Sequence, residues 1–233
     1  MEKNRETAQK ILDRKPLATV DSDIIPVKGG KIIDTAVEWI EANPQTPAQT
    51  IIGTVEIDAI GIRHDFGRTR YSNKLATLPA VKTVLENGAY LEKLPDLAGT
   101  TATNHYFAAP VAIDGTDTYL FVRVKEKDTK FFYAHEVFSP EEIEKAKPLD
   151  TVLSEIRHQM QTVHRNKQDS IKWSDLYRSI IKHFKEGKPS DITPLSATSS
   201  EMSRPLGKQG LTAVRENAAL PHLPTRISTM TQI

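Results

Sequence analysis

Three consecutive apolar-rich segments, separated by short polar stretches, lie in the middle of the chain at residues 104–113, 118–126 and 130–138. These segments are rich in aromatic and β-branched residues, which favours β-strands. Their connections contain "DGTD" and "KD", and both are typical of tight turns. The pattern therefore predicts a three-stranded antiparallel meander.

Apolar residues three or four positions apart predict helices on both sides of this meander. Before it, the helical segments are 3–14, 31–43, 58–66 and 72–87. Pro79 is expected to kink or divide the last of them. After the meander, the helical segments are 139–147, 150–166 and 169–186. The β-branched run at 50–57 predicts one more strand.

Together these elements predict an α+β fold, in which N-terminal helices pack on a small antiparallel sheet made of one strand and the meander. We expect a helical lead-in over residues 1–48 and a compact domain over 49–148. A basic helical extension over 150–186 and a disordered tail over 187–233 follow. The tail is rich in Pro, Ser and Thr and has no aromatic residue, so it cannot bury enough apolar surface to offset its ordering entropy.

Composition narrows the possible functions. The net charge of +1 neither suggests nor excludes nucleic acid. The absence of Cys excludes disulfides, thiolate catalysis and Cys-ligated zinc. No His pair has the spacing of a known metal-ligand motif, so we expect no metal or other cofactor. The charged N-terminus and the lack of a long apolar run predict a cytoplasmic protein without a membrane partner.

A basic stretch at residues 61–74 is the first candidate for chemistry. It contains His64, Arg68, Arg70, Tyr71 and Lys74. Imidazole can move protons near neutral pH, and Arg and Lys stabilise phosphate charge. The stretch is therefore a candidate phosphate site. The alternative is an ordinary helix end whose cations face water.

A second group of candidates lies on the meander. Strand alternation puts Tyr133 and His135 on one face of the third strand. Arg123 neighbours Tyr133 in one register, whereas a two-residue turn after Glu126 puts Val122 beside Tyr133 instead. The alternative is that His135 is a half-buried histidine bonded to the backbone. For His105, the alternative is that it merely ends its strand.

Other sites find little support in the sequence. "VKGGK" lacks the P-loop pattern, and no G-x-S-x-G elbow anchors a catalytic Ser. The predicted helices at 150–186 carry many basic residues. These residues could bind a nucleic-acid backbone. The alternative is that the two helices form a hairpin whose basic residues face solvent.

The order of three stretches resembles a known family. They are "TVEID" with "IRHDFGRTRYSNKLATLPAVKTVLENGAYL", then "YFAAPVAIDGTDTYLFVRVKE", then "FFYAHEVF", over about residues 50–138. This order is similar to that of the phage polyvalent-protein domains of the barnase–EndoU–colicin–RelE-like nuclease superfamily. The closest branch is the large polyvalent protein-associated domain of type three.

The resemblance implies N-terminal helices on a four-stranded antiparallel sheet, and a metal-independent ribonuclease or a relative that has lost activity. In that chemistry a 2′-hydroxyl attacks the adjacent phosphate. His64 would match the helix-borne His of the family and Lys74 its following Lys, while Tyr133 and His135 sit where the last strand contributes. No acidic residue clearly matches the general base of the bacterial enzymes.

The first hypothesis is therefore a ribonuclease acting as a toxin or host-takeover effector. His64 and His135 would share the acid and base roles, Lys74 and Arg68 would hold the phosphate, and Tyr133 would orient a base. Further substrate contacts are expected from Arg70, Tyr71, Arg123 and His105.

The expected partners are RNA and a host or phage protein. The expected location is the host cytoplasm, reached with a phage particle or a secretion machine. The alternative is a non-catalytic module of a phage polyvalent or head-associated protein that binds nucleic acid or protein. An ADP-ribosylating transferase is a third class, for which the sequence holds no signature.

Overall fold

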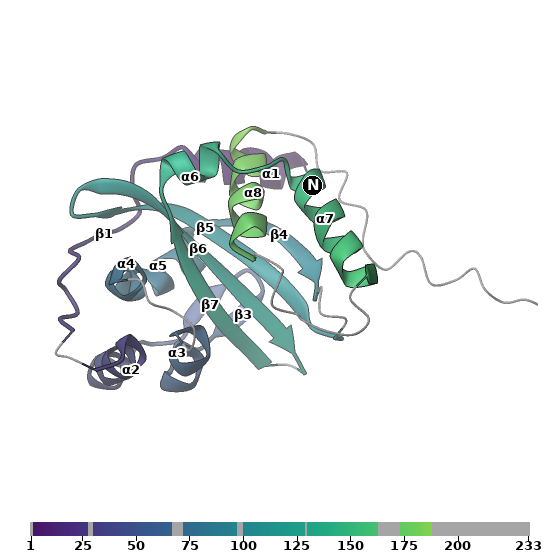
Figure 1. Ribbon diagram of the computed structural model, residues 1–233. Coiled ribbons are helices and arrows are strands. Elements are labelled where there is room, and N and C mark those ends of the chain that lie inside the picture. Colours follow the sequence, from purple (N-terminus) through teal and green to yellow (C-terminus); the bar gives the residue numbers. More distant parts are fainter. Residues whose placement is uncertain are drawn as a thin grey trace, which may run out of the picture. The chain divides into compact units, whose positions relative to one another are not determined.

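The computed structural model describes residues 2–27, 30–66, 72–96, 100–128, 130–162 and 173–187. Within these ranges a mainly antiparallel sheet lies between two layers of helices (Figure 1). The predicted mixed α+β class is confirmed. The predicted tail lies outside the described residues. No helix in the described ranges is long and apolar enough to cross a bilayer.

The predicted meander forms the centre of the sheet. It consists of β5 (Thr103–Ile113), β6 (Thr116–Lys127) and β7 (Lys130–Phe138). Asp114 and Gly115 both have positive φ, at 50° and 75°, and make the tight turn between β5 and β6. This left-handed backbone is what a two-residue hairpin turn requires.

Two strands that the sequence did not predict extend the sheet beyond β5. β4 (Ala89–Pro95) pairs antiparallel with the first half of β5, and β1 (Thr19–Val20) pairs parallel with its end. β4 has an irregular register between Tyr90 and Glu92. This β-bulge and the short length of β1 explain why neither strand has a clear alternating pattern.

The register between β6 and β7 differs from both alternatives considered above. Lys127 pairs with Lys130, so the turn begins one residue later than Glu126. Tyr133 consequently lies opposite Val124, and His135 lies opposite Val122. Arg123 lies opposite Ala134 and therefore points to the other face of the sheet from Tyr133 and His135.

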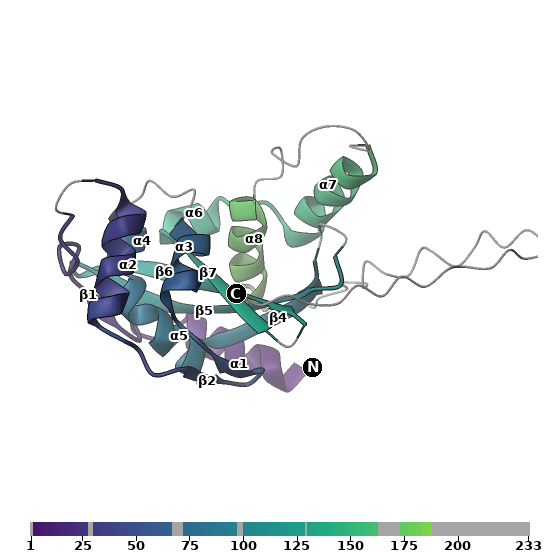
Figure 2. The same ribbon diagram turned by 90° about the horizontal axis from the view of Figure 1, so that it is seen from below.

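One layer of helices covers what we call the first face of the sheet (Figure 2). Its elements are α2 (Ile32–Ala42), α3 (Ala59–Phe66), α4 (Ser72–Ala76), a 3-10 helix (Leu78–Ala80) and α5 (Val81–Asn87). Pro79 divides the predicted helix 72–87, as expected. The core beneath includes Phe107, Val111, Leu120, Val122 and Tyr133.

The prediction of a single strand over residues 50–57 was wrong. β2 (Ala48–Thr50) and β3 (Gly53–Val55) form a separate two-stranded hairpin. Gly53 has φ 123°, and the Thr50 hydroxyl donates a hydrogen bond to the Gly53 carbonyl at 2.7 Å. The left-handed glycine reverses the chain inside the β-branched run.

The second layer covers the opposite, second face of the sheet. It contains α1 (Glu2–Leu12), α6 (Pro140–Glu144), α7 (Leu149–Thr162) and α8 (Trp173–Lys185). Tyr106 and Phe121 of the sheet pack with Leu176 and Ile180 of α8 in this core. The helices of the predicted extension therefore bury apolar surface against the same sheet.

Candidate functional site

The most unusual group of side chains lies where α3 and α4 meet the outer edge of β7. Asp65 comes from the end of α3, Lys74 from α4 and His135 from β7. All three are buried, with side-chain exposures of 0%, 3% and 0%. Charged side chains are rarely this deeply buried unless they are paired. We refer to these three residues as the buried triad.

Asp65 is the centre of the buried triad. Its Oδ1 atom lies 2.7 Å from Lys74 Nζ and accepts a hydrogen bond from the backbone N–H of His135 at 3.0 Å. Its Oδ2 atom lies 2.5 Å from His135 Nδ1, at ion-pair distance but without the alignment of a directed hydrogen bond. The carboxylate therefore links two helices to the last strand of the sheet.

The imidazole of His135 has an acceptor at each nitrogen. Nδ1 faces the Asp65 carboxylate, and Nε2 lies 2.9 Å from the backbone carbonyl oxygen of Lys74. A carbonyl can only accept, so Nε2 carries a hydrogen. The ring of Phe66 closes the site, with its centroid 5.5 Å from that of His135 and 5.2 Å from Lys74 Nζ.

Opposing effects act on the pKa of Asp65. Burial raises it, but the charges of His135 and Lys74, and their hydrogen bonds, lower it further than burial raises it. The net result is a pKa below the ordinary value for Asp. Asp65 is therefore ionised at neutral pH and balances positive charge in the interior.

The buried triad also provides a hydrogen-bond acceptor for the backbone at an edge of the sheet. β7 is a terminal strand among the described strands, and edge strands leave backbone N–H groups unpaired. Asp65 accepts the N–H of His135 at this edge. The triad thus has a clear structural role, because it anchors α3 and α4 and prevents pairing with another strand at this point.

Tyr133 lies beside the triad but does not join it. It is 1% exposed, and its hydroxyl has no hydrogen-bond partner among the described residues. Burial, and then the charges of Asp65 and Asp58, raise its pKa above the ordinary value for Tyr. Its ring packs against Gly61, where an added Cβ would lie 2.7 Å from Tyr133 Cε1.

An open cleft of about 570 Å³ begins where the buried triad ends. We call it the β7 cleft; it is lined by Asn73, Lys74, Thr118, Glu136, Val137, Phe138, Ser139, Glu142, Ser174 and Arg178. Lys74 Nζ lies 3.6 Å from Glu136 Oε1, whose side chain is 40% exposed. Arg178 pairs with Glu142 at 3.3 Å. The cleft therefore carries charges of both signs.

The other predicted site residues do not gather at the triad. His64 is exposed on α3, on the side away from the buried Asp65 and Phe66. Arg68, Arg70 and Tyr71 lie outside the described residues. Arg123 lies on the second face near the buried Tyr177: burial raises the pKa of that phenol, and Arg123 partly offsets this increase.

His105 belongs to a separate hydrogen-bonded chain at another end of the sheet. Its Nδ1 lies 3.1 Å from the Tyr90 hydroxyl, and its Nε2 lies 3.0 Å from Glu126 Oε2. Burial, followed by the charges of Glu92 and Glu126, raises the pKa of Tyr90 to about 12. Tyr90 therefore stays protonated and links β4 to β5 and β6.

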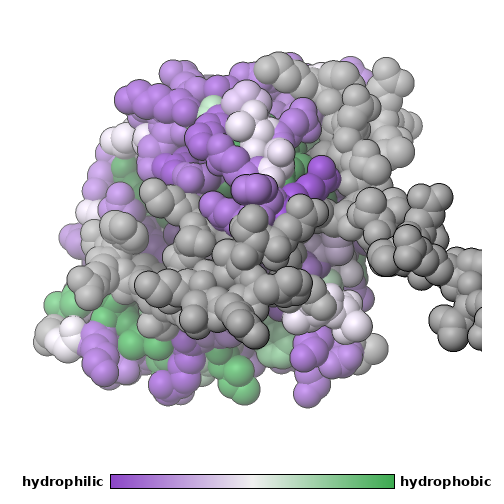
Figure 3. All heavy atoms as spheres, turned by 45° about the vertical axis from the view of Figure 1, so that its right-hand side comes forward, coloured by the Kyte–Doolittle hydropathy of each residue, from purple (hydrophilic) through white to green (hydrophobic). Residues whose placement is uncertain are grey.

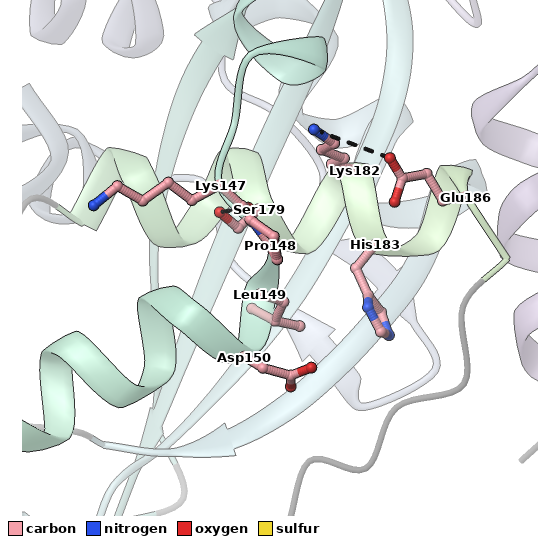
Figure 4. Close-up of a pocket in the computed structure, with 8 residues that line it drawn as sticks. All are labelled: Lys147, Pro148, Leu149, Asp150, Ser179, Lys182, His183 and Glu186. Carbon is pink, nitrogen blue, oxygen red and sulfur yellow. Dashed lines mark hydrogen bonds and ion pairs between the residues drawn. The ribbon is translucent and has the colours of Figure 1, made fainter.

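A second hollow, of about 280 Å³, lies between α7 and α8 (Figure 4). Its cations are already engaged. Lys182 Nζ donates to the carbonyls of Glu144 and Ala146 at 2.7 and 2.9 Å, and Lys147 pairs with Glu155 at 2.7 Å. No group of three His, Asp or Glu residues in the described ranges is arranged to hold a metal ion.

Asp65 and Glu136 are the residues that sequence reasoning missed. Asp65 shares the buried side of α3 with Ile62 and Phe66, at spacings of three and one. A carboxylate on the apolar side of a helix signals a buried cationic partner, and this signal was available. Glu136 points to the opposite face of β7 from His135, and only the folded edge brings it to Lys74.

The fold and site define a mixed α+β domain with a buried triad beside a polar cleft. Residues 31–133 match the model of the family described as large polyvalent protein-associated domain 3. The match covers less than half of the chain, and it supports the predicted resemblance to phage polyvalent-protein domains over those residues. It includes Asp65 and Lys74 and ends two residues before His135. Neither the curated proteins nor the solved structures contain a match.

Proposed function

We propose that this domain is a non-catalytic module that binds a protein partner through the β7 cleft. The observation that carries the proposal is the complete burial of His135. Both of its ring nitrogens face groups of the protein itself, the Asp65 carboxylate and the Lys74 carbonyl. A general acid or base must reach the proton of its substrate, and these contacts leave His135 no nitrogen for that purpose.

The charges of the triad support the same conclusion. Lys74 directs its ammonium group to Asp65, at 2.7 Å from Oδ1 and 3.1 Å from the backbone oxygen. An ammonium that stabilises a phosphate would need to be exposed to it. With 3% exposure, Lys74 acts instead as an internal counter-ion.

The lining of the β7 cleft favours a protein over a nucleic acid. Binding to a phosphate backbone depends on an excess of Lys and Arg. Here Arg178 pairs with Glu142 at 3.3 Å and with Asp175 at 2.5 Å, and the 40% exposed Glu136 adds another negative charge. Polar side chains of both signs around apolar Val137 and Phe138 suit a peptide segment.

Peptide selection tests this proposal. A displayed library of random peptides is selected on the full chain, and binding of the recovered peptides is measured by calorimetry. Asn73→Arg adds a long side chain to the cleft at an exposed position and should weaken binding at least tenfold. Asn87→Arg, at an exposed position on α5 outside the cleft, is the matched control and should bind as the wild type. Equal binding by both variants, or no recovered peptides, would refute the proposal.

A ribonuclease is the second candidate, since the fold gathers a carboxylate, an imidazole and an ammonium from three separate segments. RNA transesterification uses groups of these kinds. For this candidate to hold, α3 and α4 would have to move away from β7 when RNA binds. The expected product is a 2′,3′-cyclic phosphate, formed with or without Mg²⁺.

An RNA assay separates the two candidates. Labelled RNA is incubated with the wild type, His135→Gln and the exposed-site variant His64→Ala, and circular dichroism checks that each variant is folded. The protein-binding proposal predicts intact RNA in every sample. Cleavage that His135→Gln abolishes in a folded protein would establish the ribonuclease instead.

A further inference from the structure

Two neighbouring helices on the first face of the sheet present exposed rows of opposite character. On α2, Asp34, Glu38 and Glu41 are all exposed and recur at helical spacing. We call these residues the α2 row. They lie on the side of the helix away from the buried Ala36, Val37 and Ile40. Within the described part of the chain, none of the three forms an ion pair.

The α3 row consists of Ile60, Arg63 and His64, at spacings of three and four. All three are exposed, and Ile60 is 69% exposed. Arg63 and His64 also form no ion pair with any described residue. The row therefore combines a large apolar side chain with one permanent cation and one imidazole.

The two helices lie side by side in both ribbon views, and they contact each other (Figures 1 and 2). Figure 3 shows hydrophobic surface along the lower part of the molecule, at the height of α2 and α3 in Figure 1, while the upper part is mainly hydrophilic. Ile24 and Val27, in the loop before α2, are 45% and 48% exposed.

From this arrangement we infer that a second copy of this chain docks on the α2–α3 surface. A twofold axis running between the helices, along their length, places α2 of one copy over α3 of the other. Each acidic α2 row then faces a basic α3 row, and this pairing occurs twice. The two Ile60 side chains are removed from water at the same time. The inference is independent of the β7 cleft and of the proposed function.

A second copy explains the surface better than another partner. A nucleic acid would be repelled by the α2 row, and a purely basic or acidic protein would match only one row. Self-association matches both. With α2 and α3 only about 16 Å and 12 Å long, the contact is small, so the dimer should be weak and concentration-dependent.

Sedimentation velocity of the full chain over a range of concentrations tests the inference. The wild type should show a reversible monomer–dimer equilibrium that weakens at high salt. Ile60→Asp should raise the dissociation constant at least tenfold. Ile51→Asp is the matched control. Ile51 is 71% exposed on the β2–β3 turn, but it lines a different hollow, together with Ala8 and Ile11 of α1. This variant should dimerise like the wild type.

Charge reversal then tests the pairing of the rows. Glu38→Lys and Arg63→Glu should each weaken the dimer by about three- to tenfold, since every pair occurs twice. The double variant should regain most of the lost affinity, because the opposite charges face each other again. Lys127→Glu, at an exposed position at the end of β6, is the control for net charge. The inference would be overturned by a monomer at every concentration or by equal effects of Ile60→Asp and Ile51→Asp. It would also be overturned if the double variant lost as much dimer affinity as the two single variants lose together.

Discussion

Replacing Asp65 by Asn tests the buried triad most directly. The substitution keeps the size of the side chain and its oxygen acceptor for the His135 N–H, so it removes mainly the negative charge. Lys74 then remains in the interior without its nearest counter-ion, and His135 loses the carboxylate beside its Nδ1. Removing one partner of a buried ion pair costs about 3–5 kcal/mol in free energy of unfolding.

The lower end of this range applies here. Lys74 keeps Glu136 at 3.6 Å, and that carboxylate is 40% exposed, so part of the charge stays compensated. We therefore expect a loss of about 3 kcal/mol. This loss is a large fraction of the roughly 5–15 kcal/mol by which domains are stable. It is smaller than that total, so the variant should still fold.

Urea denaturation measures the effect. With a slope near 2 kcal/mol per molar urea, the midpoint should fall by about 1.5 M. Trp39 packs against the core of the first face and Trp173 against that of the second, so fluorescence reports on both layers. Asp13→Asn, at an exposed position after α1, is the control and should change stability by less than about 0.5 kcal/mol.

Acidification gives a second measurement on the same variant. Because the pKa of Asp65 is lowered in the folded chain, its carboxylate stabilises the fold above the unfolded-state pKa of about 4. That contribution is lost as the pH falls through the folded-state pKa. The difference between wild type and Asp65→Asn should therefore shrink below about pH 4. A midpoint within about 0.3 M of the wild type at neutral pH would refute the assigned role of the triad.

Substitutions at three further positions test the surroundings of the triad and the N-cap of α6. Gly61→Ala should destabilise the domain by about 1–3 kcal/mol, because its Cβ would meet the buried Tyr133 ring at 2.7 Å; an unchanged melting temperature would contradict that close packing. Tyr133→Phe should be neutral or slightly stabilising in urea denaturation, since the buried hydroxyl has no partner among the described residues. A loss above about 1 kcal/mol would instead point to a bound water or ligand group at that hydroxyl. Ser139→Ala should cost about 1 kcal/mol in the same assay, because Ser139 and Glu142 form a capping box at the start of α6, with bonds of 3.2 and 2.9 Å; Ser139→Asp should retain most of the stability.

The amino-acid sequence alone determined the local elements of this protein. Runs of aromatic and β-branched residues between tight turns identified β5, β6 and β7, because such residues favour strands. Helical spacing identified α2 and α3, and Pro79 marked the break before α5. These features depend on neighbours close in sequence, so a single chain is enough to recognise them.

The tertiary structure decided where the chain reverses and which face of the sheet each side chain of β7 occupies. It divided the run 50–57 into a hairpin through the positive φ of Gly53, and it set the β6–β7 register one residue beyond Glu126. A shift of one residue exchanges the two faces of a strand, and the alternating pattern of β7 has large side chains on both faces. Pattern alone therefore could not assign the register.

The candidate site depended even more on tertiary structure. Lys74 and His135 were recognised from their residue types, but their burial was not, and neither was the role of Asp65 as their common partner. The sequence separates Asp65 from His135 by 70 positions, and only the packing of α3 against β7 brings them together. Residue type fixes which charges a side chain can carry, whereas the fold decides whether these charges meet solvent or each other.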